Sequence, residues 1–141
     1  MEKLKNYNGR YCESEYESVF IAFLESVGWH YLAGNQIRRS YHEVLIAEDF
    51  KAFIAKSNPS LLLEENEQIY DTVRLVGAES DFATLHKAYK WMVDGIQFTL
   101  RSGLPAIIPL IDFETPENNI FRVVNQFTVE YINNGQREKR R

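Results

Sequence analysis

Residues 104–131 read LPAIIPLIDFETPENNIFRVVNQFTVEY, two apolar segments on either side of a polar turn. From Ile120 to Tyr131, successive side chains alternate between two faces, which predicts one long and largely buried strand. The apolar segment before the turn predicts a second strand. Pro109 cannot donate a ladder hydrogen bond, so we expect this strand to lie at an edge or to bulge there.

Upstream of this stretch, the spacing of the apolar residues changes from the two-residue period of strands to the ~3.6-residue period of helices. Ile96, Phe98 and Leu100 alternate with polar residues, which predicts a half-buried strand before the turn at residues 102–103. Upstream, apolar spacing and turn residues predict four helices, over residues 15–27, 48–57, 64–77 and 80–94, the last capped by Ser80. We therefore expect an α+β fold with helices packed on a small, mainly antiparallel sheet. Residues 14–94 form the helical part, and residues 95–131 form the strands.

The first helix has the clearest pattern in the chain. Its apolar residues recur at helical spacing and predict an inward face, while Gly28 can cap the end: Tyr16, Val19, Phe20, Phe23, Leu24 and Val27. Ser14 and Glu17 match a capping box, in which each side chain accepts a hydrogen bond from a backbone amide of the first turn. Glu17 therefore has a structural role available.

Length and composition favour one ordinary domain spanning residues 1–141. No apolar run approaches the ~20 residues of a membrane helix, and the first ten residues lack the apolar core of a signal peptide. With one cysteine, Cys12, the chain has no internal disulfide, as suits a reducing compartment. We expect a cytoplasmic protein with no membrane partner.

The charge is unevenly distributed. The net charge is −4, yet the last five residues, REKRR, carry four basic groups and one acid. An acidic body has no overall attraction for DNA, whereas the basic tail at 137–141 is either a solvated end or a phosphate contact through Lys139, Arg140 and Arg141.

Most site patterns are absent. The histidines are far apart, no glycine-rich loop ends in Lys-Ser or Lys-Thr, and no nucleophile elbow is present. Asp112 and Glu114 lie near a strand end, where turn roles are favoured over metal binding. The aromatic residues fit core positions better than a stacking surface for single-stranded nucleic acid. No metal site is predicted in this chain.

Three separated segments carry a resemblance to a known family: YESVFIAFLESVGWHYLAG, RRSYHEVLI and LIDFETPENNIFRVVNQFTVEY. In order and spacing they resemble the amino-terminal nuclease region of the R (HsdR-type) subunit of bacterial type I restriction-modification enzymes. The part around NNIFRVVNQFTV is the most specific, because strand periodicity does not demand Asn-Asn or Val-Asn-Gln-Phe. The resemblance covers nearly the whole chain.

The resemblance implies a PD-(D/E)xK nuclease, in which an aspartate and a Glu-x-Lys hold magnesium and activate water. Here the chain stops at Arg141, before the Arg-Pro-Asp segment, so we expect an incomplete nuclease domain with no cofactor of its own. The intact subunit would use Mg²⁺ and ATP. It would translocate and cut foreign DNA together with methyltransferase (M) and specificity (S) subunits. Such nucleases often place a glutamate of the first helix near the metal, and Glu17 is the best match. The active-site role and the capping role of Glu17 both stay open.

A second hypothesis belongs to a different class of protein. The same scaffold could form a standalone binding or interaction module without catalysis. In the truncated nuclease domain, the strand over 120–131 lacks the next neighbour that it would have in the intact nuclease, so we expect the tail, or a second copy of the chain, to cover the open edge.

Overall fold

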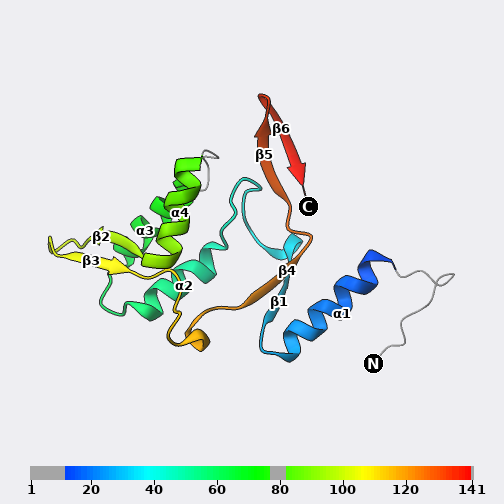
Figure 1. The fold of residues 1–141 in the computed structure, drawn as a ribbon, viewed down its shortest axis with the longest axis horizontal. Coiled ribbons are helices and arrows are strands. Elements are labelled where there is room, and N and C mark those ends of the chain that lie inside the picture. Colours follow the sequence, from blue (N-terminus) through cyan, green and yellow to red (C-terminus); the bar gives the residue numbers. More distant parts are fainter. Residues whose placement is uncertain (1–11, 77–81, 141) are drawn as a thin grey trace. The chain divides into compact units, whose positions relative to one another are not determined.

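The computed structural model describes residues 12–76 and 82–140 (Figure 1). In these residues it has four α-helices: α1 (Glu13–Ser26), α2 (Ala47–Ser57), α3 (Leu63–Val76) and α4 (Phe82–Asp94). Two short 3₁₀ helices are η1 (Gly34–Gln36) and η2 (Pro116–Asn118). The strands are β1 (His30–Ala33), β2 (Ile96–Thr99), β3 (Pro105–Ile108), β4 (Arg122–Asn125), β5 (Val129–Asn133) and β6 (Gln136–Arg140). The predicted α+β class is confirmed.

The chain forms two compact units. Among the described residues, the first unit contains those up to Arg38 and those from Phe121 to Thr128, with α1, β1, η1 and β4. The second unit contains residues 39–120 and 129–140. The prediction of a single domain over residues 1–141 stays a prediction.

The strands pair two by two rather than in one sheet. β2 with β3 and β5 with β6 are antiparallel, as predicted for most of the strands, whereas β1 and β4 run parallel. Residues 30–33 were predicted to belong to a helical region, and that prediction is wrong, because they form β1. Their hydrogen bonds go to a segment 92 positions away, from His30 with Arg122 to Ala33 with Asn125, a partner that local periodicity does not reveal.

The long strand predicted over residues 120–131 is broken in two. β4 ends at Asn125, and β5 begins at Val129. Between them Gln126 has a φ of 52°, in the left-handed region, which no regular strand contains. The residues of β4 are half-buried rather than fully buried.

Helix α1 begins and ends close to the predicted bounds. Gly28 has a φ of 95°, and its amide donates to the Glu25 carbonyl at 3.1 Å, so the predicted glycine cap is confirmed. The predicted inward face is wrong. Glu17, Ile21 and Leu24 are the half-buried side of the helix. Five apolar side chains of the predicted face are more than half exposed: Tyr16, Val19, Phe20, Phe23 and Val27.

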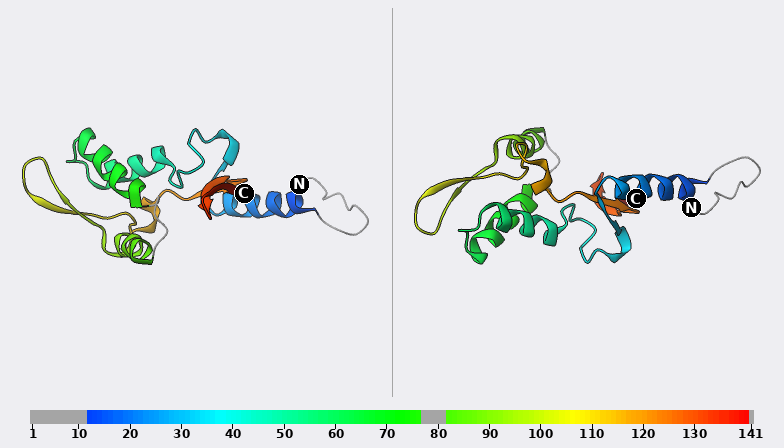
Figure 2. Two further views of the ribbon diagram at one scale, coloured as in Figure 1. Left: turned by 90° about the horizontal axis from the view of Figure 1, so that it is seen from above. Right: turned by 90° about the horizontal axis from the view of Figure 1, so that it is seen from below.

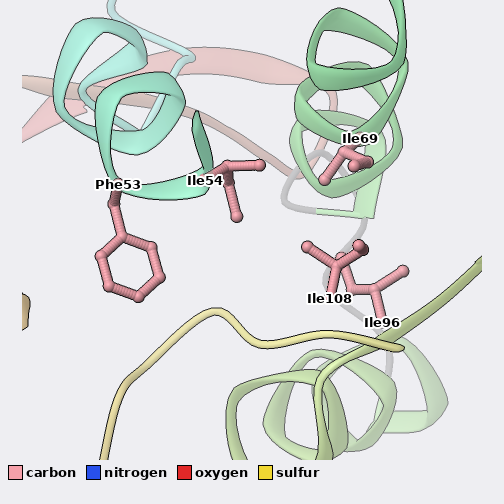
Figure 3. Packing of buried hydrophobic residues seen from close by; sticks show 5 residues of the cluster. All are labelled: Phe53, Ile54, Ile69, Ile96 and Ile108. Carbon is pink, nitrogen blue, oxygen red and sulfur yellow. The ribbon is translucent and has the colours of Figure 1, made fainter. Parts of the chain in front are cut away.

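The hydrophobic core of the second unit joins two helices to the β2–β3 hairpin. In Figure 3, Ile54 of α2 and Ile69 of α3 lie above Ile96 of β2 and Ile108 of β3, and the ring of Phe53 of α2 lies to the left of them. Ile54 and Ile69 have no exposed surface. The helix predicted over residues 48–57 thus supplies two residues of the core, Phe53 and Ile54.

Helix α4 contributes to this core differently from its sequence pattern. Trp91 packs against the core, whereas the apolar residues whose helical spacing predicts this helix are exposed: Phe82, Leu85, Tyr89 and Met92. The predicted Ser80 cap lies outside the described residues.

The turn of the β2–β3 hairpin is attached to α3. In both views of Figure 2, this turn extends past the helices of the second unit. The Glu65 carboxylate accepts hydrogen bonds from the backbone amides of Arg101 and Leu62, each at 2.8 Å. These two bonds, that from Arg101 first, hold the pKa of Glu65 below its usual range. One buried carboxylate thus caps the start of α3 and fixes the hairpin turn.

The end of the described chain forms a hairpin rather than a solvated tail. Asn134 and Gly135 have φ values of 49° and 78°, which suit a two-residue turn of type I′ between β5 and β6. Because β6 pairs with β5, the tail covers part of the edge that the sequence left open, from Val129 to Tyr131.

We predict that Ile69→Ala lowers the free energy of unfolding by about 2–5 kcal/mol, because it leaves a cavity in a fully buried site. Leu75→Ala on the same helix is the matched control. Leu75 is 65% exposed, so its truncation should change stability by no more than about 0.5 kcal/mol. Urea unfolding of both variants measures the difference, and equal losses would contradict this core.

Glu65 makes stability depend on pH. Its pKa is lowered by folding, so its contribution is fully present above the unfolded glutamate value of about 4.3 and is lost as pH falls through the folded value. Glu65→Gln should lower the unfolding midpoint at pH 7 and flatten the decline below pH 5, because an amide offers one acceptor oxygen instead of two. Thermal unfolding from pH 3 to 7 tests this, and an unchanged acid decline would argue against the role of Glu65.

Candidate functional site

Glu17 lies in the first unit, on the side of α1 that faces β1 and β4. The Gln126 amide nitrogen donates to Glu17 Oε1 at 2.8 Å, and the Asn125 amide nitrogen donates to Glu17 Oε2 at 3.2 Å. The Tyr31 hydroxyl of β1 donates to Asn125 Oδ1 at 2.9 Å. We call these four residues the Glu17 cluster.

The capping role does not belong to Glu17. The helix begins two residues earlier than predicted, at Glu13 rather than at residue 15, and the Cys12 backbone amide donates to Glu15 Oε2 at 2.8 Å. Glu15 therefore occupies the third helical position, where a capping carboxylate is expected. The predicted Ser14 and Glu17 capping box is wrong, because a start at Glu13 makes Glu17 the fifth helical residue, two positions past the capping position.

The backbone around the Glu17 cluster is tightly packed. A side chain at Gly34 would place its Cβ 2.5 Å from the Asn125 carbonyl oxygen and 2.6 Å from that of Gln126. At the other end of β4, the His30 amide donates to the Phe121 carbonyl, and the rings of Trp29 and Phe121 lie 5.3 Å apart. Both ends of the strand pair are thus fixed.

Asp112 acts as a turn residue, as the sequence favours. Its carboxylate accepts hydrogen bonds from the Asn118 side-chain amide and from the backbone amides of Thr115 and Glu114. These bonds, that of Asn118 first, hold the pKa of Asp112 below its usual range. With its oxygens used in this way, Asp112 organises the turn into η2.

The basic residues of the tail lie on β6 and have partners within the second unit. Lys139 Nζ lies 4.6 Å from the centroid of the Tyr41 ring and 4.0 Å from Glu130 Oε2. The Arg140 guanidinium lies 5.5 Å from the centroid of the Tyr131 ring. Arg141 lies outside the described residues. Contact of these basic groups with DNA phosphates stays a prediction.

Other candidates do not form a site in the described ranges, 12–76 and 82–140. No group of three or more His, Cys, Asp or Glu side chains there is arranged to hold a metal ion. Cys12 is exposed and carries a free thiol. Over the same residues, no helix combines the length and the apolar character that crossing a membrane requires.

Sequence reasoning missed three of the four residues of the Glu17 cluster. Tyr31 was expected in the helical part of the chain, while Asn125 and Gln126 were assigned to opposite faces of one strand. A signal was nevertheless present, because strand periodicity does not demand the Asn-Gln pair inside an apolar stretch.

Comparisons with known proteins point to one kind of system. The family model described as "Type I restriction enzyme R protein N terminus" matches residues 10–141. The "Putative type I restriction enzyme MjaIXP endonuclease subunit" of Methanocaldococcus jannaschii is 29% identical over 134 residues, which cover 88% of this chain and 13% of the relative. The "Type I restriction enzyme HindI endonuclease subunit" of Haemophilus influenzae is 28% identical over 140 residues, 89% of this chain and 13% of the relative. The chain thus spans about an eighth of these relatives, and no solved structure shows a significant match.

The cap assignment predicts that Glu15→Ala lowers the free energy of unfolding by about 0.5–1 kcal/mol more than Glu13→Ala does. Both changes remove a first-turn carboxylate and gain the helix propensity of alanine, but only Glu15 accepts the Cys12 amide. Chemical denaturation of the two variants isolates this bond. Equal losses would mean that the carboxylate acts only through the helix dipole.

Proposed function

The chain belongs to the family of the type I restriction enzyme R protein N terminus, and from this membership we propose that it forms the first part of the nuclease domain of an R subunit. The observation that carries the proposal is the Glu17 carboxylate, held beside the end of β4 by side chains 108 and 109 positions away. A carboxylate of the first helix at a strand end is the arrangement that the resemblance to PD-(D/E)xK nucleases implies.

The fold class that we propose is an incomplete restriction-endonuclease-like domain. The described residues hold no cluster fit for a metal ion, so Glu17 alone does not make a magnesium site. We propose that the catalytic aspartate and the Glu-x-Lys belong to residues beyond Arg141. Magnesium would supply charge neutralisation and an activated water there, and Glu17 would contribute one carboxylate.

We propose the remaining properties of the intact R subunit from the same family membership. They comprise ATP-driven translocation on DNA, assembly with M and S subunits, and a cytoplasmic location. Within this chain, Lys139, Arg140 and Arg141 would contact DNA phosphates. The edge of β4 that β1 does not cover could pair with a second copy of the chain, as open edges do.

The competing function is a binding or interaction module without catalysis. The exposed apolar face of α1 favours it, because exposed apolar patches often mark contact surfaces. The reading frame discriminates between the two functions. Continuation into Arg-Pro-Asp and Glu-x-Lys supports the nuclease, whereas its absence from the frame supports the module.

We predict that residues 1–141 alone do not cut DNA in the presence of magnesium and ATP, because groups that act as a unit lose most of their catalysis when some are missing. The complete reading frame should nick plasmid DNA, and Glu17→Ala should abolish the nicking. Glu25→Ala, which removes an exposed carboxylate from the same helix, should leave it intact.

A plasmid nicking assay with the purified 141-residue chain, the complete protein and both variants tests this proposal. Nicking by residues 1–141 that Glu17→Ala abolishes would place the active site wholly within this chain. Equal activity of the complete protein and its Glu17→Ala variant would remove Glu17 from the site.

A further inference from the structure

We propose that Asn125 and Gln126 are positioning residues, whose side-chain amides orient the Glu17 carboxylate, and that Tyr31 fixes the amide of Asn125. This inference rests on the proposed function, because it assigns how the active-site carboxylate of that function is held. It goes beyond that function by adding three residues that act through Glu17.

The hydrogen bonds fix both oxygens of one carboxylate. Gln126 donates to Oε1 and Asn125 donates to Oε2, so rotation of the carboxylate would break both bonds. A carboxylate offers about four lone-pair positions, and these two donors use one on each oxygen. Among residues 12–76 and 82–140, the second lone pair of each oxygen stays available, and its direction is set by the two amides.

The amide of Asn125 is itself fixed by Tyr31. An amide group can turn over and exchange its oxygen with its nitrogen. Because the Tyr31 hydroxyl donates to Asn125 Oδ1, the nitrogen is directed to Glu17. The Tyr31 hydroxyl therefore donates to the amide oxygen of Asn125, and the amide nitrogen of Asn125 donates to the Glu17 carboxylate.

The backbone conformation of Gln126 serves this arrangement. Successive side chains of a regular strand point to opposite faces, so residues 125 and 126 of an unbroken strand could not share one carboxylate. The φ of 52° at Gln126 ends the alternation and lets both amides reach Glu17. A left-handed conformation at a residue other than glycine is unfavourable and is found preferentially at functional sites.

Gly34 completes the arrangement from the β1 side. The carbonyls of Asn125 and Gln126 lie where a Cβ at position 34 would be, so only glycine lets the backbone approach this closely. The segment that carries both amides is thus held by backbone packing as well as by its own side chains.

A purely structural role makes different predictions from a positioning role. If Gln126 served only to connect β4 to β5, the effect of a substitution on activity would depend on how much backbone strain that substitution relieves. Gln126→Gly relieves the left-handed conformation, and Gln126→Ala keeps the strain, yet both remove the amide. A positioning role predicts equal loss of function in both variants despite different stabilities.

The first test is plasmid cleavage by the complete reading frame that contains this chain. Asn125→Ala, Gln126→Ala and Gln126→Gly should each lower kcat about 10- to 100-fold with KM for DNA unchanged, because misplaced groups lose rate rather than binding. Tyr31→Phe should lower kcat less, since it removes only the outermost bond. Gln97→Ala, an exposed strand glutamine of the second unit, is the control that should keep full activity. Restored cleavage by Gln126→Gly, or full cleavage by Asn125→Ala and Gln126→Ala, would overturn the inference.

The second test needs no cleavage and uses residues 1–141. Glu17→Gln should shift the side-chain amide resonances of Asn125 and Gln126 in ¹H–¹⁵N spectra and leave that of Gln97 in place. Unshifted resonances would overturn the inference whatever the activity. If Glu17→Ala keeps cleavage in the complete protein while the resonances shift as expected, the proposed function of Glu17 fails, and the positioning inference falls with it. If Glu17→Ala abolished cleavage while the variants of Asn125 and Gln126 kept it, only the positioning role would be overturned.

Discussion

The parallel pairing of β1 with β4 is the constraint on which the candidate site depends. It sets Ala33 opposite Asn125 and brings α1 against the end of β4, so that Glu17 meets residues more than a hundred positions away. Parallel strands need a long crossing connection, and here residues 39–120 supply it as a unit with its own core. The pairing therefore joins the first and the last of the three segments that carry the resemblance.

Three carboxylates in the chain are held in two different ways. Asp112 and Glu65 each accept two backbone amides, and Asp112 also accepts the side-chain amide of Asn118. These bonds build a turn and join a helix to a hairpin. Glu17 accepts hydrogen bonds from the side-chain amides of Asn125 and Gln126. Almost any residue can supply a backbone amide donor, whereas side-chain amides at two adjacent positions require Asn or Gln at both. Glu17 thus differs from Asp112 and Glu65 in the backbone amides that those two carboxylates accept.

Local patterns predicted the elements that depend on local interactions. The four helices, the Gly28 cap, the β2–β3 hairpin and the Asp112 turn follow from spacing and turn chemistry, and the structure contains them. The parallel partner of β1 could not be predicted, because residues 30–33 show no clear alternation of apolar and polar side chains that would mark them as a strand. β6 was missed since its residues are polar, although Asn134-Gly135 is a strong hairpin signal. Glu17 was identified as a candidate, but its partners depend on a left-handed residue and a non-local contact, which periodicity does not encode.

The division of the first unit into two separated segments also has a consequence for the order of events during synthesis. His30 leaves the ribosome 92 residues before its partner Arg122. At about 5–20 residues per second, β1 therefore waits on the order of 5–20 seconds, whereas helices form within about a microsecond. The helices that follow β1 can pack in that time, but α1 and β1 have no partner strand. With its exposed aromatic side chains, the first helix is then the part of the nascent chain most open to chaperones or to neighbouring chains.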